Sequence, residues 1–148
     1  MNFEKFYIHR THSSKARMVP DLDSRHVSLD VFLEYELQAS SRYRRYVSLV
    51  LLKVAGNGNG SPYLKDAISD CIRACDAAFA YGNYVAVLMG ETDDKGPSAA
   101  IERYRRNLNS RGHDVHFASV TYPGDGTTAE DLGRVLWQRI EESKTGVN

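Results

Sequence analysis

The sequence lacks the features that mark several specialised classes of protein. It has two cysteines in 148 residues, and its basic and acidic residues are equal in number at 19 each. The formal net charge of zero gives no overall field that would attract nucleic acid or an acidic membrane. No apolar run approaches the roughly 18 residues of a membrane span, and the N-terminus lacks the apolar core of a signal peptide. We therefore expect one cytoplasmic domain, without nucleic acid among its partners and without a membrane span.

Cysteine and histidine, the usual ligands of zinc in proteins, are also few. Cys71 and Cys75 lie four residues apart on a predicted helix, which places both on its apolar face and differs from the Cys-x-x-Cys spacing of zinc sites. His9 and His12 have no further ligand close by in the sequence, whereas a zinc site usually needs about three or four protein ligands. We predict buried, reduced thiols, no metal site and no cofactor.

Hydrophobic periodicity becomes clear after residue 27. Residues 1–27 show no regular period and are interpreted as an N-terminal extension or linker, which packs against the domain or connects it to a partner. Ser28 is a suitable N-cap for a helix that runs to about Arg45. Val47–Val54 is a nearly continuous apolar run, as expected of a buried central strand.

The remaining pattern predicts residues 28–148 to be one domain. The later elements are a helix from Ser61 or Pro62 to Cys75, a hairpin from Ala77 to Met89, a helix from Pro97 to about Arg111, a strand from His113 to Tyr122, and a last helix with Leu132, Val135, Leu136 and Ile140 as its apolar positions. The order helix, β, α, β-hairpin, α, β, α predicts an α+β fold. We expect a ferredoxin-like palm whose central, mostly antiparallel sheet is flanked by helices.

The predicted hairpin is the most distinctive stretch. Two apolar runs, Ala77–Tyr81 and Tyr84–Met89, flank the dipeptide Gly82-Asn83. Glycine and asparagine tolerate the positive φ that tight hairpin turns require, so this dipeptide is a strong hairpin signal. Arg73 and Asp76 lie three residues apart where the preceding helix leads into the first strand.

Two motifs resemble the GGDEF family, the diguanylate cyclases that condense two GTP molecules into cyclic di-GMP. Arg73-x-x-Asp76 is followed after five residues by a hairpin, as in the family, and Tyr122-Pro123-Gly124-Asp125-Gly126 resembles its Tyr-Pro-x-Asp-Gly stretch. The Gly-Gly-Asp/Glu-Glu-Phe signature is replaced by Gly82-Asn83-Tyr84-Val85, which is one residue shorter and has no acidic residue. The resemblance covers about Ser28 to Glu142 and indicates a degenerate GGDEF domain.

The resemblance implies that catalysis is lost. The family's first-strand aspartate, which binds the catalytic magnesium, corresponds to Lys53. A charged lysine does not ligate a divalent cation, and cyclase chemistry needs such a cation to neutralise the triphosphate and activate the attacking hydroxyl. We expect no catalytic residues and no enzyme activity. An active nucleotide cyclase with relocated metal ligands is the remaining enzymatic hypothesis.

The resemblance also implies a second site. In many family members the Arg-x-x-Asp pair binds the product cyclic di-GMP, helped by an arginine on the helix after the hairpin; the matching residues are Arg73, Asp76 and Arg103. Guanidinium groups pair with phosphate oxygens or with the O6/N7 edge of guanine, and a carboxylate accepts hydrogen bonds from guanine N–H groups. We expect a bacterial cyclic di-GMP receptor or regulator that also contacts a partner protein.

The same three residues have ordinary structural interpretations. Arg73 is also interpretable as a solvated cation at a helix C-terminus, Asp76 as a side chain bonded to the backbone of the turn, and Arg103 as a surface arginine. The alternative function is a ligand-independent protein–protein interaction module, with residues 1–27 as one candidate contact.

Overall fold

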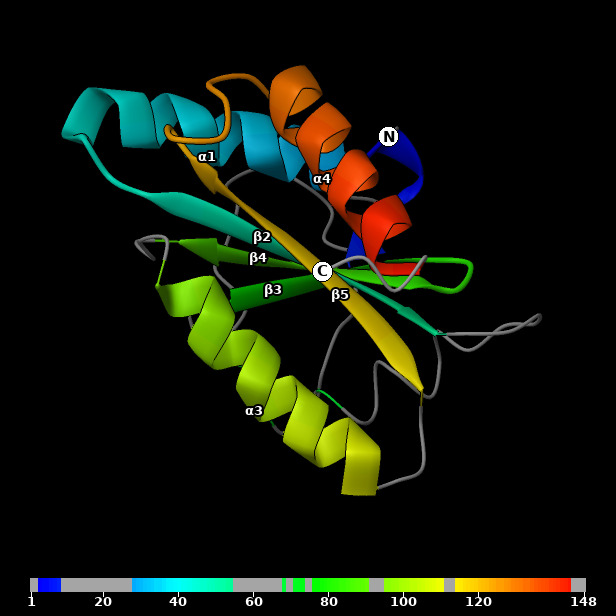
Figure 1. The fold of residues 1–148 in the computed structure, drawn as a ribbon. Helices are drawn as coiled ribbons and strands as arrows, with labels where there is room; N and C mark the ends of the chain where they lie inside the picture. The colour runs from blue at the N-terminus through cyan, green and yellow to red at the C-terminus, as the bar shows by residue number, and fades with distance from the viewer. Residues whose placement is uncertain are drawn as a thin grey trace.

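The computed structural model describes residues 3–8, 28–54, 68, 71–73, 76–90, 95–110 and 114–144. These form an antiparallel sheet with the strand order β1-β3-β4-β2-β5 and with helices on both faces (Figure 1). The strands are β1 (Tyr7–Ile8), β2 (Val47–Val54), β3 (Asp76–Tyr81), β4 (Tyr84–Gly90) and β5 (Val115–Tyr122). The helices are the 3₁₀ helix η1 (Phe3–Lys5) and the α-helices α1 (Leu29–Tyr43), α3 (Gly96–Ser110) and α4 (Ala129–Lys144).

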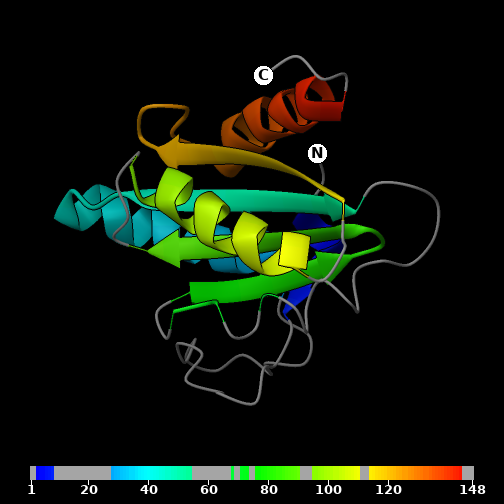
Figure 2. The ribbon, with the colours of Figure 1, turned by 60° about the horizontal axis from the view of Figure 1, so that its bottom comes forward.

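This arrangement confirms the predicted α+β palm with an antiparallel central sheet. Helices α1 and α4 cover one face of the sheet and α3 covers the other, as the two views in Figures 1 and 2 show. None of the helices in the described ranges is long and apolar enough to cross a membrane.

Strand β2 is the centre of the sheet. It pairs with β4 on one side and with β5 on the other, and its first six residues are buried. A strand that is covered on both faces has apolar side chains at nearly every position, which explains why Val47–Val54 is a nearly continuous apolar run. Ser48 is the polar exception, and its Oγ shares a 2.8 Å hydrogen bond with Oγ1 of Thr121, so this buried hydroxyl pair is satisfied.

The two faces of the sheet build separate hydrophobic clusters. Leu49 and Leu51 of β2 belong to the cluster beneath α1 and α4, whereas Val50 and Leu52 belong to the cluster against α3. This alternation follows from the two-residue period of a strand. From α3, the buried residues of the second cluster are Ala100, Tyr104 and Leu108, and Ile101 is partly buried against it.

Residues 3–8 of the N-terminal extension pack against the domain. Phe3 and Phe6 are buried in the cluster under α1 and α4, and β1 pairs with the outer edge of β3. The N–H of Leu29 donates a 2.7 Å hydrogen bond to the carbonyl of Phe6, which joins this segment to the start of α1. The sequence pattern assigned no element here, because a two-residue strand has no measurable period.

Most predicted boundaries agree with the structure within one or two residues. Helix α1 begins after Ser28, whose Oγ lies 3.5 Å from the N–H of Val31, and it ends before Arg44, which adopts a left-handed φ of 55°. The predicted helix ending at Cys75 lies mostly outside the described residues. Within that span, Ile68 is helical and fully buried, but residues 71–73 form a turn and are not helical, so the prediction that the helix continues to Cys75 is wrong at this end.

The connection from β5 to α4 is held by Asp125. Its carboxylate accepts a 2.9 Å hydrogen bond from the N–H of Thr121 and a fork from Arg139, with Nη1–Oδ2 and Nη2–Oδ1 distances of 3.0 and 2.8 Å. Arg139 Nη1 also donates to the carbonyl of Ser119 at 2.8 Å. A bidentate, charge-assisted contact of this kind fixes α4 against β5.

Glycine is required at one position of this connection. A Cβ built on Gly126 would lie 2.9 Å from Asp131 Cβ and 3.3 Å from the backbone nitrogen of Leu132. Asp131 is held there because its N–H donates to Thr128 Oγ1 at 3.1 Å, which caps the N-terminus of α4. A Cβ on Gly124 would meet only the Thr121 carbonyl, at 4.0 Å.

We predict that Gly126→Ala destabilises the fold by about 1–3 kcal/mol, because the new methyl group forces the first turn of α4 away from the loop. Gly124→Ala is the matched control and should stay within about 0.5 kcal/mol of the wild type. Urea denaturation measures both. Equal stabilities for the two variants would contradict the close approach at Gly126.

The pH dependence of stability tests the Asp125 contact. The hydrogen bond from Arg139 holds the pKa of Asp125 below its ordinary value, and the Thr121 N–H acts in the same direction. Because the folded pKa is the lower one, the stabilisation is present at neutral pH and is lost as pH falls below about 4. We predict that Asp125→Asn costs about 1 kcal/mol at pH 7, a value reduced for partial exposure. The difference from wild type should shrink in denaturation at pH 3; a constant difference would refute the assignment.

Candidate functional site

Arg73 and Asp76 form a closed turn where the chain enters β3. The N–H of Asp76 donates to the carbonyl of Arg73 at 3.0 Å, and the N–H of Arg73 donates to Asp76 Oδ2 at 3.1 Å. The guanidinium adds two contacts to the same carboxylate, from Nε to Oδ2 at 3.4 Å and from Nη2 to Oδ1 at 3.2 Å. The three-residue spacing lets the carboxylate reach a backbone N–H of its own turn, so the pair has a local structural role as well.

The two side chains of this pair differ in exposure. The Asp76 side chain is 0% exposed, whereas that of Arg73 is 47% exposed. A buried carboxylate is costly unless it is paired, and the guanidinium provides that pairing from the solvent side. A ligand arriving from solvent therefore meets Arg73 before it meets Asp76.

Arg103 reaches the same turn from α3. Its Nε donates a 3.2 Å hydrogen bond to the carbonyl of Cys71, two residues before Arg73. Within the described structure, its Nη2 is buried and has no hydrogen-bond partner. A buried, unpaired donor on a charged group is rare in folded proteins and often marks a site where something else binds. Cys71 is partly buried, and Cys75 lies outside the described ranges.

Tyr104 is the fourth residue of this corner. It is 0% exposed, and its hydroxyl has no hydrogen-bond partner among the described residues. Burial, and next the negative charge of Asp76, raise the pKa of this hydroxyl far above its ordinary value, while Arg103 and Arg73 act in the opposite direction. Sequence reasoning did not propose Tyr104 as a site residue; its position directly after Arg103 was the available signal.

The structure therefore pairs Arg73 with Asp76 and places Arg103 against Cys71, two residues before that pair, and we call these three residues with Tyr104 the arginine corner. Two guanidinium groups from different elements converge on it, one half exposed and one with an unused N–H donor. Such groups pair with phosphate oxygens or with the hydrogen-bonding edge of guanine. The chemistry that this corner offers is recognition of an anion or a guanine edge.

The hairpin lies at the opposite end of β3. Gly82 has a φ of 58°, as in a two-residue turn with glycine at its first position, and the Asn83 carbonyl accepts a 3.2 Å hydrogen bond from the N–H of Val54. Lys53 pairs with Tyr84 across the sheet, and its Nζ lies 5.5 Å from the centre of the Tyr84 ring. The position that the GGDEF resemblance assigns to a metal-binding aspartate thus carries an ammonium group near an aromatic face.

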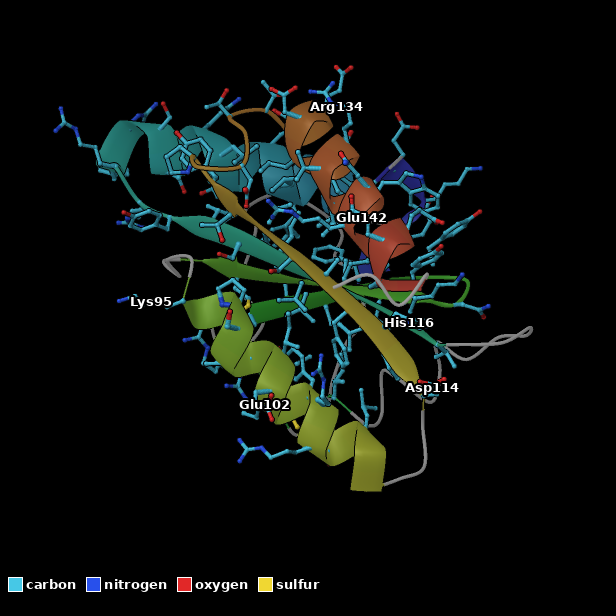
Figure 3. All side chains as sticks on the ribbon, in the orientation of Figure 1. Lys95, Glu102, Asp114, His116, Arg134 and Glu142 are labelled. Carbon is cyan, nitrogen blue, oxygen red and sulfur yellow. The ribbon has the colours of Figure 1, made fainter. Side chains whose placement is uncertain are left out.

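Further aromatic side chains lie at this end of the sheet. Tyr84 also contacts Trp137 of α4, with 6.1 Å between ring centres, and both Trp137 and Tyr81 are partly exposed. His116 pairs with Lys53 from the β5 side and lies at the same end of the sheet (Figure 3). We call Tyr81, Tyr84 and Trp137 the hairpin aromatic surface. Among the residues that the structure describes, no group of three or more His, Cys, Asp or Glu side chains is placed to hold a metal ion.

Known proteins resemble this chain in structure rather than in sequence. No protein-family model matches the chain, and no curated protein matches it significantly. Among solved structures, a DGC protein from Thermotoga maritima aligns with a TM-score of 0.65 and 16% identity, over 74% of this chain and 88% of that chain. The GGDEF domain of TpbB (YfiN) from Pseudomonas aeruginosa aligns with a TM-score of 0.67 and 14% identity, over 79% and 81% of the two chains.

A further similar structure is that of the diguanylate cyclase SiaD from Pseudomonas aeruginosa, solved in complex with its activator SiaC. It aligns with a TM-score of 0.69 and 15% identity, over 80% of this chain and 54% of that chain. Similarity at these identities shows architecture, and the shared architecture agrees with the motifs at Arg73-x-x-Asp76 and Tyr122–Gly126. The chain has the fold of a GGDEF domain.

Proposed function

We propose that this chain is a catalytically inactive, cytoplasmic domain of GGDEF fold that binds cyclic di-GMP at the arginine corner and acts as a bacterial receptor or regulator. The observation that carries the proposal is the hydrogen bond from Arg103 to the carbonyl of Cys71, two residues before the Arg73–Asp76 pair, together with a buried Nη2 donor that has no partner in the described structure. A ligand with phosphate oxygens and guanine edges supplies the acceptors that such donors lack.

Each residue of the corner has a distinct role in this proposal. Arg73, with its half-exposed guanidinium, makes the first contact with a phosphate or with guanine O6 and N7. Arg103 contributes its unused N–H from the α3 side. Asp76 accepts hydrogen bonds from guanine N–H groups only after the side chain of Arg73 turns outward. In the present structure the carboxylate is buried and hydrogen-bonded to the Arg73 guanidinium.

Catalytic inactivity is supported by the hairpin end of the sheet. A magnesium ion bound beside Lys53 would lie next to an ammonium group, and two cations repel strongly where water is scarce. The arginine corner is unaffected by this replacement. Asp76 is the first residue of β3 and Tyr81 the last, so the two ends are separated by about 17 Å along the strand.

A second function is favoured by the hairpin aromatic surface. Tyr81 is 45% exposed and Trp137 is 40% exposed, and aromatic residues of this kind are enriched in protein interfaces. A solved relative in fold, SiaD, forms a complex with an activator protein. The alternative is therefore a ligand-independent interaction module that binds a partner protein through this end of the sheet.

We predict that the purified chain binds cyclic di-GMP with a dissociation constant on the order of micromolar or tighter in calorimetric titration. Arg73→Ala and Arg103→Ala should each weaken binding by about tenfold or more, because each removes charge-assisted hydrogen bonds. Arg134→Ala is the matched control: Arg134 is an exposed arginine of α4 paired with Asp131, and its loss should leave affinity unchanged. If the wild type shows no binding, or if all three variants lose affinity equally, the result would favour the interaction module.

We also predict that the chain forms no cyclic di-GMP from GTP and magnesium, since Lys53 and Tyr84 offer no carboxylate to a metal at the hairpin. Chromatography of the reaction over several hours measures the product. Accumulating product that survives Arg73→Ala would demonstrate an enzyme with relocated metal ligands and would overturn the proposed inactivity.

A further inference from the structure

The connection from α1 to β2 carries a cluster of exposed arginine and tyrosine side chains. Residues 42–46 read Arg-Tyr-Arg-Arg-Tyr, and all five are exposed. Tyr43 is 59% exposed and Tyr46 is 49% exposed, so about half or more of each side chain is open to solvent. We call residues 42–46 the arginine–tyrosine turn. It lies at the left margin of the molecule in Figure 1, where α1 ends and the chain turns toward β2.

The backbone of this turn is fixed in one conformation. The carbonyl of Ser40, a buried residue, accepts hydrogen bonds from the N–H groups of Arg44 and Arg45, the second at 3.0 Å. Arg44 adopts the left-handed conformation, with φ 55° and ψ 47°. Helices commonly end with glycine at such a position, because a side chain makes this conformation strained. The chain therefore carries an arginine at a point where glycine would be the more stable choice, and such strain is typical of functional sites.

Helix capping accounts for only part of this cluster. A cation near the C-terminus of α1 interacts favourably with the helix dipole, which is sufficient reason for Arg42. It explains neither the strained Arg44 nor the two exposed rings. Among the described residues, no ion pair involves Arg42 or Arg44, and α1 has no acidic residue after Glu36. The positive charge of the turn is therefore not neutralised by its own helix.

The rings and the guanidinium groups are placed to act together. The guanidinium carbon of Arg45 lies 5.1 Å from the centre of the Tyr43 ring, a cation–π contact that still leaves more than half of Tyr43 exposed. Guanidinium groups form forked, charge-assisted hydrogen bonds with phosphate oxygens, and exposed aromatic rings stack on nucleobases. A single strand of nucleic acid presents phosphates and flat bases in alternation, and the turn presents arginines and tyrosines in alternation.

We propose that the arginine–tyrosine turn binds single-stranded nucleic acid, with its arginines on phosphates and with Tyr43 and Tyr46 against bases. The expectation of no nucleic-acid partner rested on the zero net charge, which excludes only an overall attractive field. Three arginines within five residues create a local one. A duplex keeps its bases stacked on one another, so it offers phosphates to the arginines and leaves the tyrosines unused. The turn shares no residue with the arginine corner, so this site goes beyond the proposed function.

Fluorescence anisotropy of a labelled oligo(dT) of about ten nucleotides, in about 50 mM salt, tests the proposal. We expect a dissociation constant on the order of 10 µM. The logarithm of the binding constant should fall with the logarithm of salt concentration at a slope of about −2, or about 0.7 for each of three neutralised phosphates. Binding to a duplex of the same length should be weaker. No binding of oligo(dT), or equal or tighter binding of the duplex, would overturn the proposal.

Tyrosine substitutions separate stacking from attraction by charge. The double variant Tyr43→Ser with Tyr46→Ser should weaken oligo(dT) binding by about fivefold or more, because both stacking platforms are lost. Tyr35→Ser is the matched control: Tyr35 is a 50% exposed tyrosine of α1 outside the turn, and its loss should leave the affinity unchanged. An unchanged affinity in the double variant, or an equal loss in the control, would overturn the proposal.

Arg44→Gly tests the strained residue with two measurements. Glycine accommodates the left-handed φ, so Tm should rise by about 2 °C, while affinity for oligo(dT) should fall by about threefold or more. Arg134→Ala is the control for charge: Arg134 is an exposed arginine of α4 paired with Asp131, and its loss should change affinity little. A purely structural role of Arg44 leaves the affinity of the glycine variant unchanged, and that result would remove Arg44 from the site.

Vesicles of equal parts phosphatidylserine and phosphatidylcholine test the other anionic partner. The proposal predicts no binding to them in the same buffer; vesicle binding without oligo(dT) binding would overturn it in favour of a membrane surface. Arg73→Ala separates this site from the arginine corner, because it should abolish cyclic di-GMP binding and keep oligo(dT) binding. Failure of one proposal is therefore distinguishable from failure of the other.

Discussion

The burial of β2 on both faces is the constraint on which the rest of the structure depends. Because β2 pairs with β4 and β5, its two ends define the two ends of the sheet. Lys53, near its C-terminal end, lies in the row of the hairpin residue Tyr84. Near its N-terminal end, Ser48 pairs with Met89, which in turn pairs with Asp76. One strand thus places the hairpin and the arginine corner at opposite ends of the sheet.

The elements that could be predicted are those whose signals are local. The run Val47–Val54 and the dipeptide Gly82-Asn83 determine a central strand and a tight turn almost irrespective of the rest of the chain. The capping of α4 by Thr128 was likewise readable from the spacing to Asp131. Residues 3–8 were not predictable, since Phe3 and Phe6 become core residues only through contacts with distant elements.

The residues of the candidate site likewise divide into those with a local sequence signal and those that depend on distant contacts. The reciprocal bonding of Arg73 and Asp76 follows from a three-residue spacing and was within reach of the sequence. The approach of Arg103 depends on how α3 crosses the sheet, and the unpaired hydroxyl of Tyr104 depends on every neighbour around it. Arg103 was a candidate only because the sequence resembles the GGDEF family. Tyr104 required three-dimensional structure, because an unpaired buried atom is a property of surroundings and leaves no pattern in a single sequence.

The position of Trp137 has a practical consequence. It is the single tryptophan of the chain, and its ring lies 6.1 Å from Tyr84 at the hairpin end, far from the arginine corner. Its fluorescence therefore reports the surroundings of the hairpin and is blind to direct contact with a molecule bound near Arg73. An emission change on ligand addition would measure communication along the length of the sheet. Trp137 is thus an intrinsic optical probe of whether the arginine corner and the hairpin are mechanically linked.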